Sequence, residues 1–175
     1  KLAEEKVNAI TIKPFRHNPQ TFGIGAWDEC PPNVNYHECV DEAQLLTEFI
    51  KYWRKEKFDI ITGWNVDSFD MTYLCNRVDK LFGEGEHKKF SPWNMSDVRE
   101  YRNQYGKMDM TFTLYGINIL DYLDLYRKHT FVNQESYKLD HIAHVELDKN
   151  KLDYSEYGSL HKLYQQNYSK YLEYN

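Results

Sequence analysis

Residues 62–70, TGWNVDSFD, carry the clearest information about the fold of this chain. The apolar run 58–64 is rich in β-branched and aromatic residues and predicts a buried strand. Apolar residues at helical spacing follow from Met71, and Gly83 supplies a stop signal, which predicts a helix. Asp70 would then lie in the first helical turn, where N–H groups and the helix dipole keep a carboxylate ionised. Ligands bind at this edge of open α/β sheets, so we expect a site there.

A purely structural alternative exists for the acidic residues of this stretch. Asp67 or Asp70 could simply cap the helix, as Asp does at many helix N-termini. On physical grounds alone, the sequence leaves both interpretations open.

The segments that precede this stretch fit an α/β fold. The runs 7–13 and 21–27 flank the turn-rich residues 17–20 and predict an antiparallel hairpin. A helix is predicted after Asp41 as N-cap, with Gln44 as its capping-box partner. Val40 is placed to staple against Leu45. The expected apolar face of this helix consists of Leu45, Leu46, Phe49, Ile50 and Trp53.

The second half of the chain mixes polar and apolar segments. Residues 84–109 are polar with balanced charges and predict an exposed hairpin or long loop, and residues 111–122 predict one strand. A short helix is expected at 139–147, and Ser159 could cap a last helix that continues to Leu172.

Composition limits the possible functions. The 175 residues are 16% aromatic and 28% charged, which is typical of a globular chain. A formal net charge of −5 excludes a protein that holds nucleic acid by bulk electrostatics, but not a nuclease whose metal ions supply positive charge. Three cysteines favour reduced thiols. No apolar run approaches the ~20 residues of a membrane span, so we expect no membrane partner and an intracellular location.

Several short motifs occur in a fixed order along nearly the whole chain. They are residues 63–70 (GWNVDSFD), Asn76-Arg77, 81–84 (LFGE), Ser91-Pro92, Asn103, Tyr105-Gly106, 120–126 (LDYLDLY), 136–140 (SYKLD) and Lys151-Leu152. With these motifs, the chain resembles the 3′–5′ exonuclease (proofreading) domain of family B DNA polymerases, of the type found in T-even bacteriophages. Residues 63–70 are similar to the second exonuclease motif of the family, an Asn followed by an aromatic residue and a metal-binding Asp.

This resemblance implies an α/β, ribonuclease-H-like fold with a mixed sheet flanked by helices. It assigns residues 1–175 to a single, partial exonuclease domain, with a protruding β-hairpin at residues 98–111. The implied reaction is hydrolysis of the 3′-terminal phosphodiester of single-stranded DNA by two divalent cations, Mg²⁺ or Mn²⁺, about 3.5–4 Å apart.

The resemblance also assigns catalytic residues. Asp70 matches the second-motif carboxylate, one of four that hold the metal pair. No first-motif D-x-E occurs before Val7, and Tyr174-Asn175 matches the opening of the third motif, whose Asp would lie three residues further. We therefore expect a chain trimmed at both ends and inactive by itself. Tyr174 matches a tyrosine that positions the attacking water; the alternative is that Tyr174 only packs its helix. Lys151 matches a lysine near the scissile phosphate; the alternative is that Lys151 is only a solvated surface charge.

Other residues match DNA-binding positions of the family. Asn65 and Phe69 would line the site of the single-stranded 3′ end, where an aromatic face can stack on a base; for Phe69 core packing is the alternative. The hairpin would help pass the primer strand between sites, with its contacts at the tip: Asn103, Tyr105, Gly106 and Lys107.

Two other functional classes remain open at this point. The chain could act as a non-catalytic single-stranded DNA-binding or structural module of a polymerase, or it could belong to another ribonuclease-H-like nuclease. Zinc binding at His37-Glu38-Cys39 or at His141 and His144 has little support, because neither has the paired spacing of a known site.

The missing first-motif strand also predicts a partner. In the family that strand lies at the centre of the sheet, between the 7–27 hairpin and the 58–64 strand, so its absence leaves unpaired edges. We expect a rearranged sheet, pairing with the rest of a polymerase chain, or a homo-oligomer formed through these edges. If the source is a phage, the location is the cytoplasm of its bacterial host.

Overall fold

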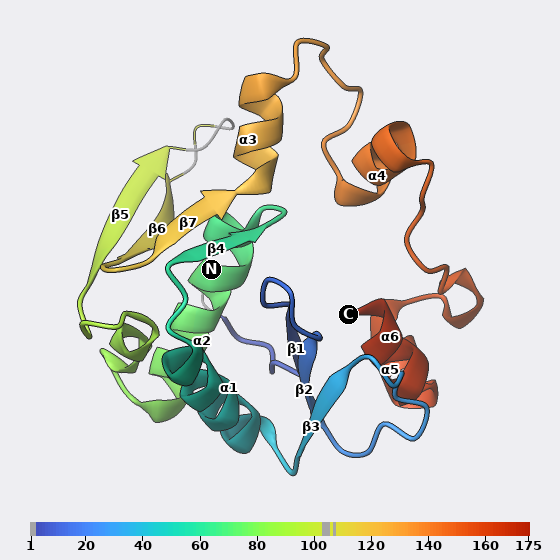
Figure 1. Ribbon diagram of the computed structural model, residues 1–175, viewed down its shortest axis with the longest axis horizontal. Coiled ribbons are helices and arrows are strands. Elements are labelled where there is room, and N and C mark those ends of the chain that lie inside the picture. Colours follow the sequence, from blue (N-terminus) through green and yellow to red (C-terminus); the bar gives the residue numbers. More distant parts are fainter. Residues whose placement is uncertain (1–2, 103–105, 107) are drawn as a thin grey trace. The chain divides into compact units, whose positions relative to one another are not determined.

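The computed structural model describes residues 3–102, 106 and 108–175 and divides into two compact units. Unit 1 comprises residues 1–6 and 50–137, and unit 2 comprises residues 7–49 and 138–175. Figure 1 shows the elements of both units. Within the described part of the chain, no helix is long and apolar enough to cross a membrane.

Unit 2 contains a three-stranded sheet in the order β1-β2-β3. Strands β1 (Ala9–Ile12) and β2 (Gln20–Ile24) pair antiparallel, which confirms the predicted hairpin. Strand β3 (Asn35–Cys39) pairs parallel with β2. The sequence does not indicate β3 clearly because polar residues interrupt its pattern.

Gly23 in β2 is a point of close approach in unit 2. A Cβ built there would lie 2.6 Å from the Tyr36 hydroxyl and 2.7 Å from the Tyr168 hydroxyl. Both hydroxyls are hydrogen-bonded to backbone: Tyr36 donates to the Gly25 carbonyl over 2.5 Å, and the Ile24 N–H donates to Tyr168 over 2.7 Å. Glycine at position 23 therefore allows two tyrosines to fasten the end of β2.

Helix α1 (Glu42–Glu56) begins as the sequence predicts. The Gln44 N–H donates to the Asp41 carboxylate over 2.8 Å, and the Val40 N–H donates to the Gln44 side chain over 2.7 Å. The predicted Val40–Leu45 staple is wrong, because Val40 is 82% exposed. Cys39 takes the buried position at the end of β3, so the alternation of the extended chain turns Val40 outward. The predicted apolar face of α1 is buried throughout.

The C-terminal part of unit 2 contains two short helices where the sequence suggested one. Helix α4 (Leu139–Leu147) matches its prediction, and η3 spans Ser155–Tyr157. Ser159 caps α5 (Leu160–Gln166) by accepting the Lys162 N–H over 3.2 Å. The expected single last helix is wrong: Asn167 leaves helical geometry and caps a separate helix, α6 (Tyr168–Tyr174), by accepting the Lys170 N–H.

Unit 1 is built around two parallel strands, β4 (Ile60–Gly63) and β7 (Asn118–Asp121). Between them in sequence lie η1 (Val66–Met71), α2 (Thr72–Phe82), η2 (Glu86–Phe90) and the antiparallel strands β5 (Ser96–Arg102) and β6 (Met108–Leu114). Helix α3 (Tyr122–His129) follows β7. The single strand predicted for 111–122 is two strands, because Gly116, with φ 90°, turns the chain.

The sheets of the two units are separate. The predicted 7–27 hairpin belongs to the β1-β2-β3 sheet, whereas the 58–64 strand forms β4 of the β4-β7 sheet. The molecule is thus a mixed α/β protein with small sheets. That residues 1–175 form a single exonuclease domain stays a prediction. That the sheet edges pair with a second chain or with a further strand also stays a prediction.

Candidate functional site

The candidate site lies where β4 and β7 end at the same edge of their sheet. The register pairs Ile60 with Asn118 and Gly63 with Asp121, so the carboxyl ends of both strands meet. The segment 62–70 leaves the sheet at this edge, as the sequence predicted, and carries Asn65, Phe69 and Asp70 with it. Gly63 permits the tight exit, because a Cβ there would lie 3.0 Å from the Val66 Cβ.

One carboxylate, that of Asp121, organises this edge. Its Oδ1 accepts the N–H of Asn65 over 2.9 Å and that of Leu123 over 3.0 Å. Its Oδ2 accepts the Asp67 N–H over 3.1 Å. Asp121 therefore caps α3 and also satisfies two N–H groups at the start of η1, where the backbone partial charge is positive.

The turn that carries Asp70 has unusual backbone geometry. Asn65 has left-handed φ and ψ values of 61° and 27°, which Asn tolerates better than most residues, and its side chain accepts the Ser68 hydroxyl over 2.6 Å. The six residues of η1 form a π-helical turn, a form that is rare and frequent at functional sites. Neither Asp67 nor Asp70 is an N-cap, because the N-cap residue is Asn65 for η1 and Met71 for α2. The capping alternative is therefore wrong.

Asp70 is exposed to solvent, but its electrostatic surroundings differ from the prediction. Desolvation raises the pKa of its carboxyl group, and the charge of Asp121 raises that pKa further, against a smaller lowering by a backbone hydrogen bond. The lowering of the pKa that a helix N-terminus would cause is therefore not found for Asp70. Asp121, rather than Asp70, occupies the positive end of the turn.

Asp67 has a similar environment. Desolvation is the main cause that raises the pKa of its carboxyl group, and the charges of Asp121 and Asp124 add to it, whereas Arg99 lowers it. The edge is thus a locally acidic surface on which added negative charge is disfavoured.

Phe69 lies on the outside of this turn. Its side chain is 47% exposed, so the core-packing alternative is wrong. Its ring stacks against Tyr73 with the centroids 6.5 Å apart and 25° between the planes. An exposed aromatic face beside Asp70 is suited to stacking on an unpaired base.

Two other predicted catalytic residues meet in unit 2. The Lys151 ammonium lies over the Tyr174 ring, 5.3 Å from its centroid. The Tyr154 ring contacts the Tyr174 ring edge-on at 5.0 Å, and the Lys151 N–H donates to Asp140 over 2.8 Å. Lys151 and Tyr174 therefore form a pair, within a different unit from Asp70.

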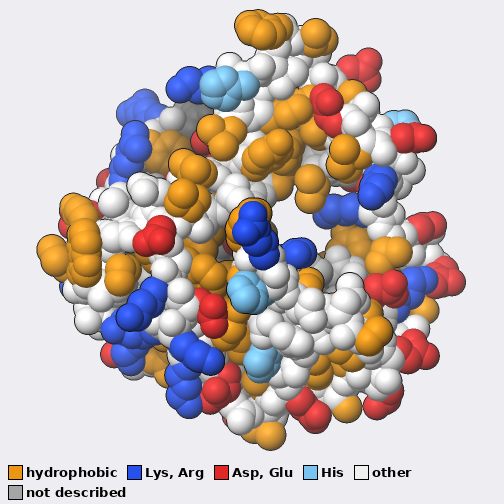
Figure 2. All heavy atoms as spheres, in the orientation of Figure 1, with side chains coloured by type: hydrophobic (Ala, Val, Ile, Leu, Met, Phe, Trp, Pro, Cys, Tyr) orange, Lys and Arg blue, Asp and Glu red, His pale blue; other side chains and the backbone are white. Residues whose placement is uncertain are grey.

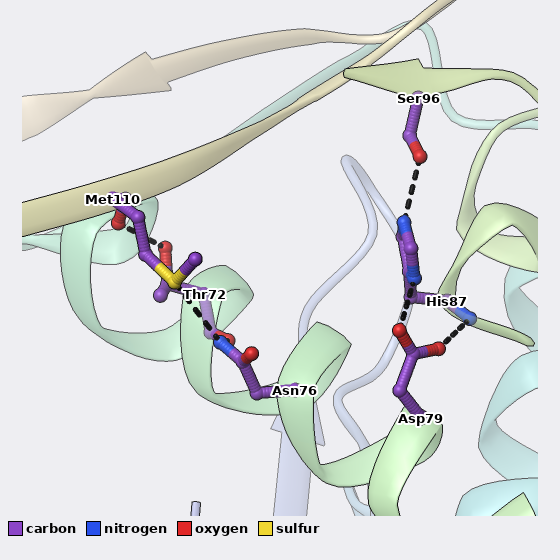
Figure 3. Close-up of polar contacts among 6 residues, drawn as sticks. All are labelled: Thr72, Asn76, Asp79, His87, Ser96 and Met110. Atoms are coloured by element: carbon purple, nitrogen blue, oxygen red, sulfur yellow. Dashed lines mark hydrogen bonds and ion pairs between the residues drawn. The ribbon is translucent and has the colours of Figure 1, made fainter. Parts of the chain in front are cut away.

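The predicted hairpin forms as β5 and β6, and α2 anchors its base (Figure 3). His87 bonds to the Asp79 carboxylate over 2.6 Å through Nδ1 and to the Ser96 hydroxyl over 2.7 Å through Nε2. The Thr72 hydroxyl donates to the Met110 carbonyl over 3.3 Å on the other strand. His87 is buried against the Phe112 ring, so this chain of bonds acts as a tether.

The predicted contacts at the hairpin tip are described only in part. Gly106 is exposed and has a positive φ of 72°, which a glycine accepts without strain. Asn103, Tyr105 and Lys107 lie outside the described residues.

A metal pair does not fit on the described side chains alone. Among them, no group of three or more His, Cys, Asp or Glu residues is arranged to hold a metal ion. Asp70 offers one exposed carboxylate, the type of ligand that Mg²⁺ and Mn²⁺ prefer. Asp121 is a poor additional ligand because its oxygens already accept three backbone N–H groups.

Comparison with known proteins identifies the family. The family model described as DNA polymerase family B, exonuclease domain, matches residues 4–142, which is more than half of the chain. The chain belongs to this family. The resemblance drawn from the sequence motifs is therefore confirmed.

Relatives of this exonuclease domain are much longer polymerases. It is 43% identical over 152 residues to the DNA-directed DNA polymerase of Escherichia phage RB69, and 38% identical over 152 residues to that of Enterobacteria phage T4. Both matches cover 85% of this chain but only 16% and 17% of the two polymerases. The DNA polymerase catalytic subunit of human herpesvirus 6B is 29% identical over 147 residues, or 81% of this chain and 14% of that subunit.

Asp121 lies in the family motif 120–126, but the sequence did not indicate its role. A weak signal was present: an Asp at the end of a strand-like run, directly before a helix, is a candidate N-cap. Its second role at the start of η1 depends on the pairing of strands almost sixty residues apart, and local sequence does not reveal that pairing.

Proposed function

We propose that this chain provides the second-motif part of a 3′–5′ proofreading exonuclease in a phage-type family B DNA polymerase, on a ribonuclease-H-like fold. The observation that carries the proposal is the edge of the β4-β7 sheet. There, Asp121 fixes a turn that carries the consecutive residues Phe69 and Asp70, and both side chains are exposed to solvent.

The reaction would be hydrolysis at the 3′ end of single-stranded DNA. Water attacks the phosphorus of the last nucleotide, and the bond from that phosphorus to the 3′-oxygen of the preceding nucleotide breaks. The departing 3′-oxygen takes up a proton, and a nucleoside 5′-monophosphate is released. Divalent cations, when bound, supply the charge stabilisation and activate the water. In this chain, Asp70 would contribute one oxygen ligand and Phe69 would stack on the terminal base.

The family resemblance also assigns roles in this reaction to other residues. Lys151 would stabilise charge on the scissile phosphate, and Tyr174 would orient the attacking water. Their mutual contact supports a shared role, because the ammonium and the phenol ring are held together. Asn65 would line the site, and the β5–β6 hairpin, with Asn103, Tyr105, Gly106 and Lys107 at its tip, would guide the primer strand.

We further propose that the 175 residues alone hydrolyse DNA very slowly or not at all. Asp70 is the one motif carboxylate that they supply, and a single carboxylate does not hold a cation pair. The test is degradation of a 3′-labelled single-stranded oligonucleotide with Mg²⁺ or Mn²⁺. Robust turnover that Asp70→Ala abolishes would contradict this proposal, whereas turnover that Asp70→Ala leaves intact would point to a contaminating nuclease.

The second candidate function is binding of single-stranded DNA without chemistry. The exposure of Phe69 favours it, because stacking on bases needs no metal ion. A metal-free sample should retain a single-stranded oligonucleotide in a salt-dependent manner, and Phe69→Ala should weaken retention. Phe15→Ala is a matched control, since Phe15 is 84% exposed and lies outside the candidate site. Equal retention by both variants would argue against this role for Phe69.

A further inference from the structure

A second concave site in unit 1 lies at the opposite end of β4 from Asp70. It is a cavity of about 350 Å³ formed by the last turn of α1, residues 57–59, residues 89–93 and the turn at Gly116. Four aromatic side chains line it: Trp53, Phe58, Phe90 and Trp93. Its volume lies at the lower end of the range for small-ligand sites.

The inner wall of this cavity is rigid. Trp53 is only 3% exposed, and its indole N–H donates to the Phe90 carbonyl over 2.7 Å. Its ring meets the rings of Phe58 and Phe90 edge-on, with centroids 5.4 Å apart in both pairs. Such packing leaves these side chains few alternative conformations and keeps the wall in place.

The outer wall depends on a glycine. A Cβ at Gly116 would lie 2.6 Å from the Pro92 Cγ and 3.3 Å from Cε2 of Trp93. The absence of a side chain therefore lets Pro92 and Trp93 lie directly on the turn. Trp93 is nevertheless 64% exposed, which is unusual for a tryptophan. A supported but solvent-facing indole ring is a suitable platform for stacking.

The rim of the cavity is basic, although the chain carries a net charge of −5. Arg54, Lys57 and Lys89 line it together with a single acid, Asp59. Figure 2 shows Lys and Arg side chains gathered on the surface over the end of α1 and the neighbouring segment that follows α2. Lys89 pairs with Glu86, so the net attraction for an anion comes mainly from Arg54 and Lys57.

Hydrogen bonds hold the Arg54 side chain in place, and Lys57 has an unusual backbone conformation. Arg54 donates to the Lys89 carbonyl over 3.0 Å and to the Asn94 side chain over 2.8 Å, which ties the helix end to the loop that carries Trp93. Lys57 follows α1 with a φ of 53°, a left-handed conformation that glycine usually supplies at this position. A lysine there costs backbone energy, and it places a positive charge at the cavity.

We propose that this cavity binds a nucleotide unit, with the base stacked on Trp93 and the phosphate between Arg54 and Lys57. An exposed aromatic platform beside two cations matches the two chemical parts of a nucleotide. The same unit can come from a free nucleoside monophosphate or from a single-stranded DNA chain. The proposal does not depend on Asp70 or on hydrolysis, because no residue of the Asp70 edge lines the cavity.

The test uses the metal-free 175-residue chain with ¹⁵N-labelled tryptophan and follows the Trp93 indole signal during titration. The probes are deoxyadenosine 5′-monophosphate, deoxyadenosine, inorganic phosphate and a short oligodeoxyadenylate. We expect the monophosphate to bind more tightly than deoxyadenosine or phosphate alone. The ratio of its affinity to that of the oligonucleotide distinguishes the free nucleotide from the strand as the source.

Variants test the contribution of individual cavity residues. Trp93→Ala should weaken binding of the monophosphate about tenfold, as expected for loss of one stacking contact. Because this variant lacks the Trp93 signal, its binding is measured by the phosphorus NMR signal of the monophosphate. Lys57→Asn should also weaken binding, and it keeps a residue that tolerates the left-handed conformation. Lys80→Gln, at an exposed helix position outside the cavity, should bind normally.

Several results would overturn the proposal. They are no binding of either the monophosphate or the oligonucleotide, deoxyadenosine binding as tightly as the monophosphate, or full affinity in both cavity variants. Circular dichroism of Trp93→Ala checks that the fold is retained, which we expect because the ring is mostly exposed. If that variant unfolds, Lys57→Asn decides the outcome by itself.

Discussion

Two regions of the molecule are held together by different contacts: the Asp70 edge of unit 1, and the tyrosine side chains of unit 2. At the Asp70 edge, a single carboxylate accepts three backbone N–H groups and fixes the turn. In unit 2, several aromatic rings act together, since Tyr36 and Tyr168 close over Gly23, and Tyr154 and Lys151 pack on Tyr174. The first arrangement depends on one side chain, whereas the second is spread over many contacts.

The largest expected effect tests the single-carboxylate side of this comparison. Asp121→Ala should destabilise unit 1 by about 2–3 kcal/mol, because three N–H groups lose a charged acceptor. Asp121→Asn should cost less, since its remaining oxygen can still accept. Chemical denaturation measures the loss, and amide NMR signals of residues 60–70 should shift while those of unit 2 stay in place.

Asp97→Asn is the control for a surface carboxylate, because Asp97 accepts only the exposed Tyr115 hydroxyl among the bonds described for it. If Asp121→Ala were as mild as this control, the turn at Asn65 would owe its position to other contacts.

A second substitution tests the tyrosine contacts of unit 2. Gly23→Ala should destabilise unit 2 by about 2 kcal/mol, because its Cβ would displace two hydrogen-bonded hydroxyls. The amide signals of residues 60–70 should be unaffected. Combining Gly23→Ala with Tyr36→Phe should recover part of the lost stability, since the closer of the two hydroxyls is then gone. No recovery would show that the tyrosine hydroxyls are not the obstacle.

A third prediction concerns one contact of the distributed set. Lys151→Met keeps an unbranched stem on the Tyr174 ring but removes the ammonium, so the cost should be only about 0.5 kcal/mol. Thermal unfolding at low and high salt measures it, with Lys149→Met as control. A loss above about 2 kcal/mol would mean that Lys151 has a structural role beyond this contact.

The last prediction is a dependence on pH. The pKa values of Asp67 and Asp70 are raised, so the folded chain holds these protons more tightly than the unfolded chain. Their contribution to stability is therefore present at low pH and is lost as the pH rises from the ordinary aspartate value through the raised pKa values. NMR titration of the side-chain carboxyl carbons should find both values lower in Asp121→Asn. Unchanged values would mean that the charge of Asp121 does not contribute to raising them.

Local signals in the sequence identified elements whose stabilising contacts are close in the chain. The β1–β2 hairpin, the start of α1 at Asp41 and the cap at Ser159 are of this kind. The breaks at Gly116 and Asn167 were missed because an apolar pattern continues across each of them. Strand β3 was missed because its partner β2, rather than its own composition, determines that it is extended.

The candidate site divides in the same way. The motif around Asp70 predicted that a turn at a sheet edge would carry Asn65, Phe69 and Asp70. It did not predict that another strand would supply the anion at the start of η1, or that the charge of this anion would raise the pKa of Asp70. The pairing of Lys151 with Tyr174 likewise depends on how a loop folds back onto α6, which residue spacing does not indicate.

The double use of Asp121 has a consequence for the substitutions that the chain can tolerate. A library selected only for folded protein should keep aspartate at position 121 and accept many residues at position 70, because Asp70 supports no cap. A library selected for hydrolysis in a complete polymerase should, under the proposed function, keep aspartate at both positions. Comparing the two libraries would therefore distinguish the aspartate that is needed for the structure of the sheet edge from the aspartate that is needed for hydrolysis.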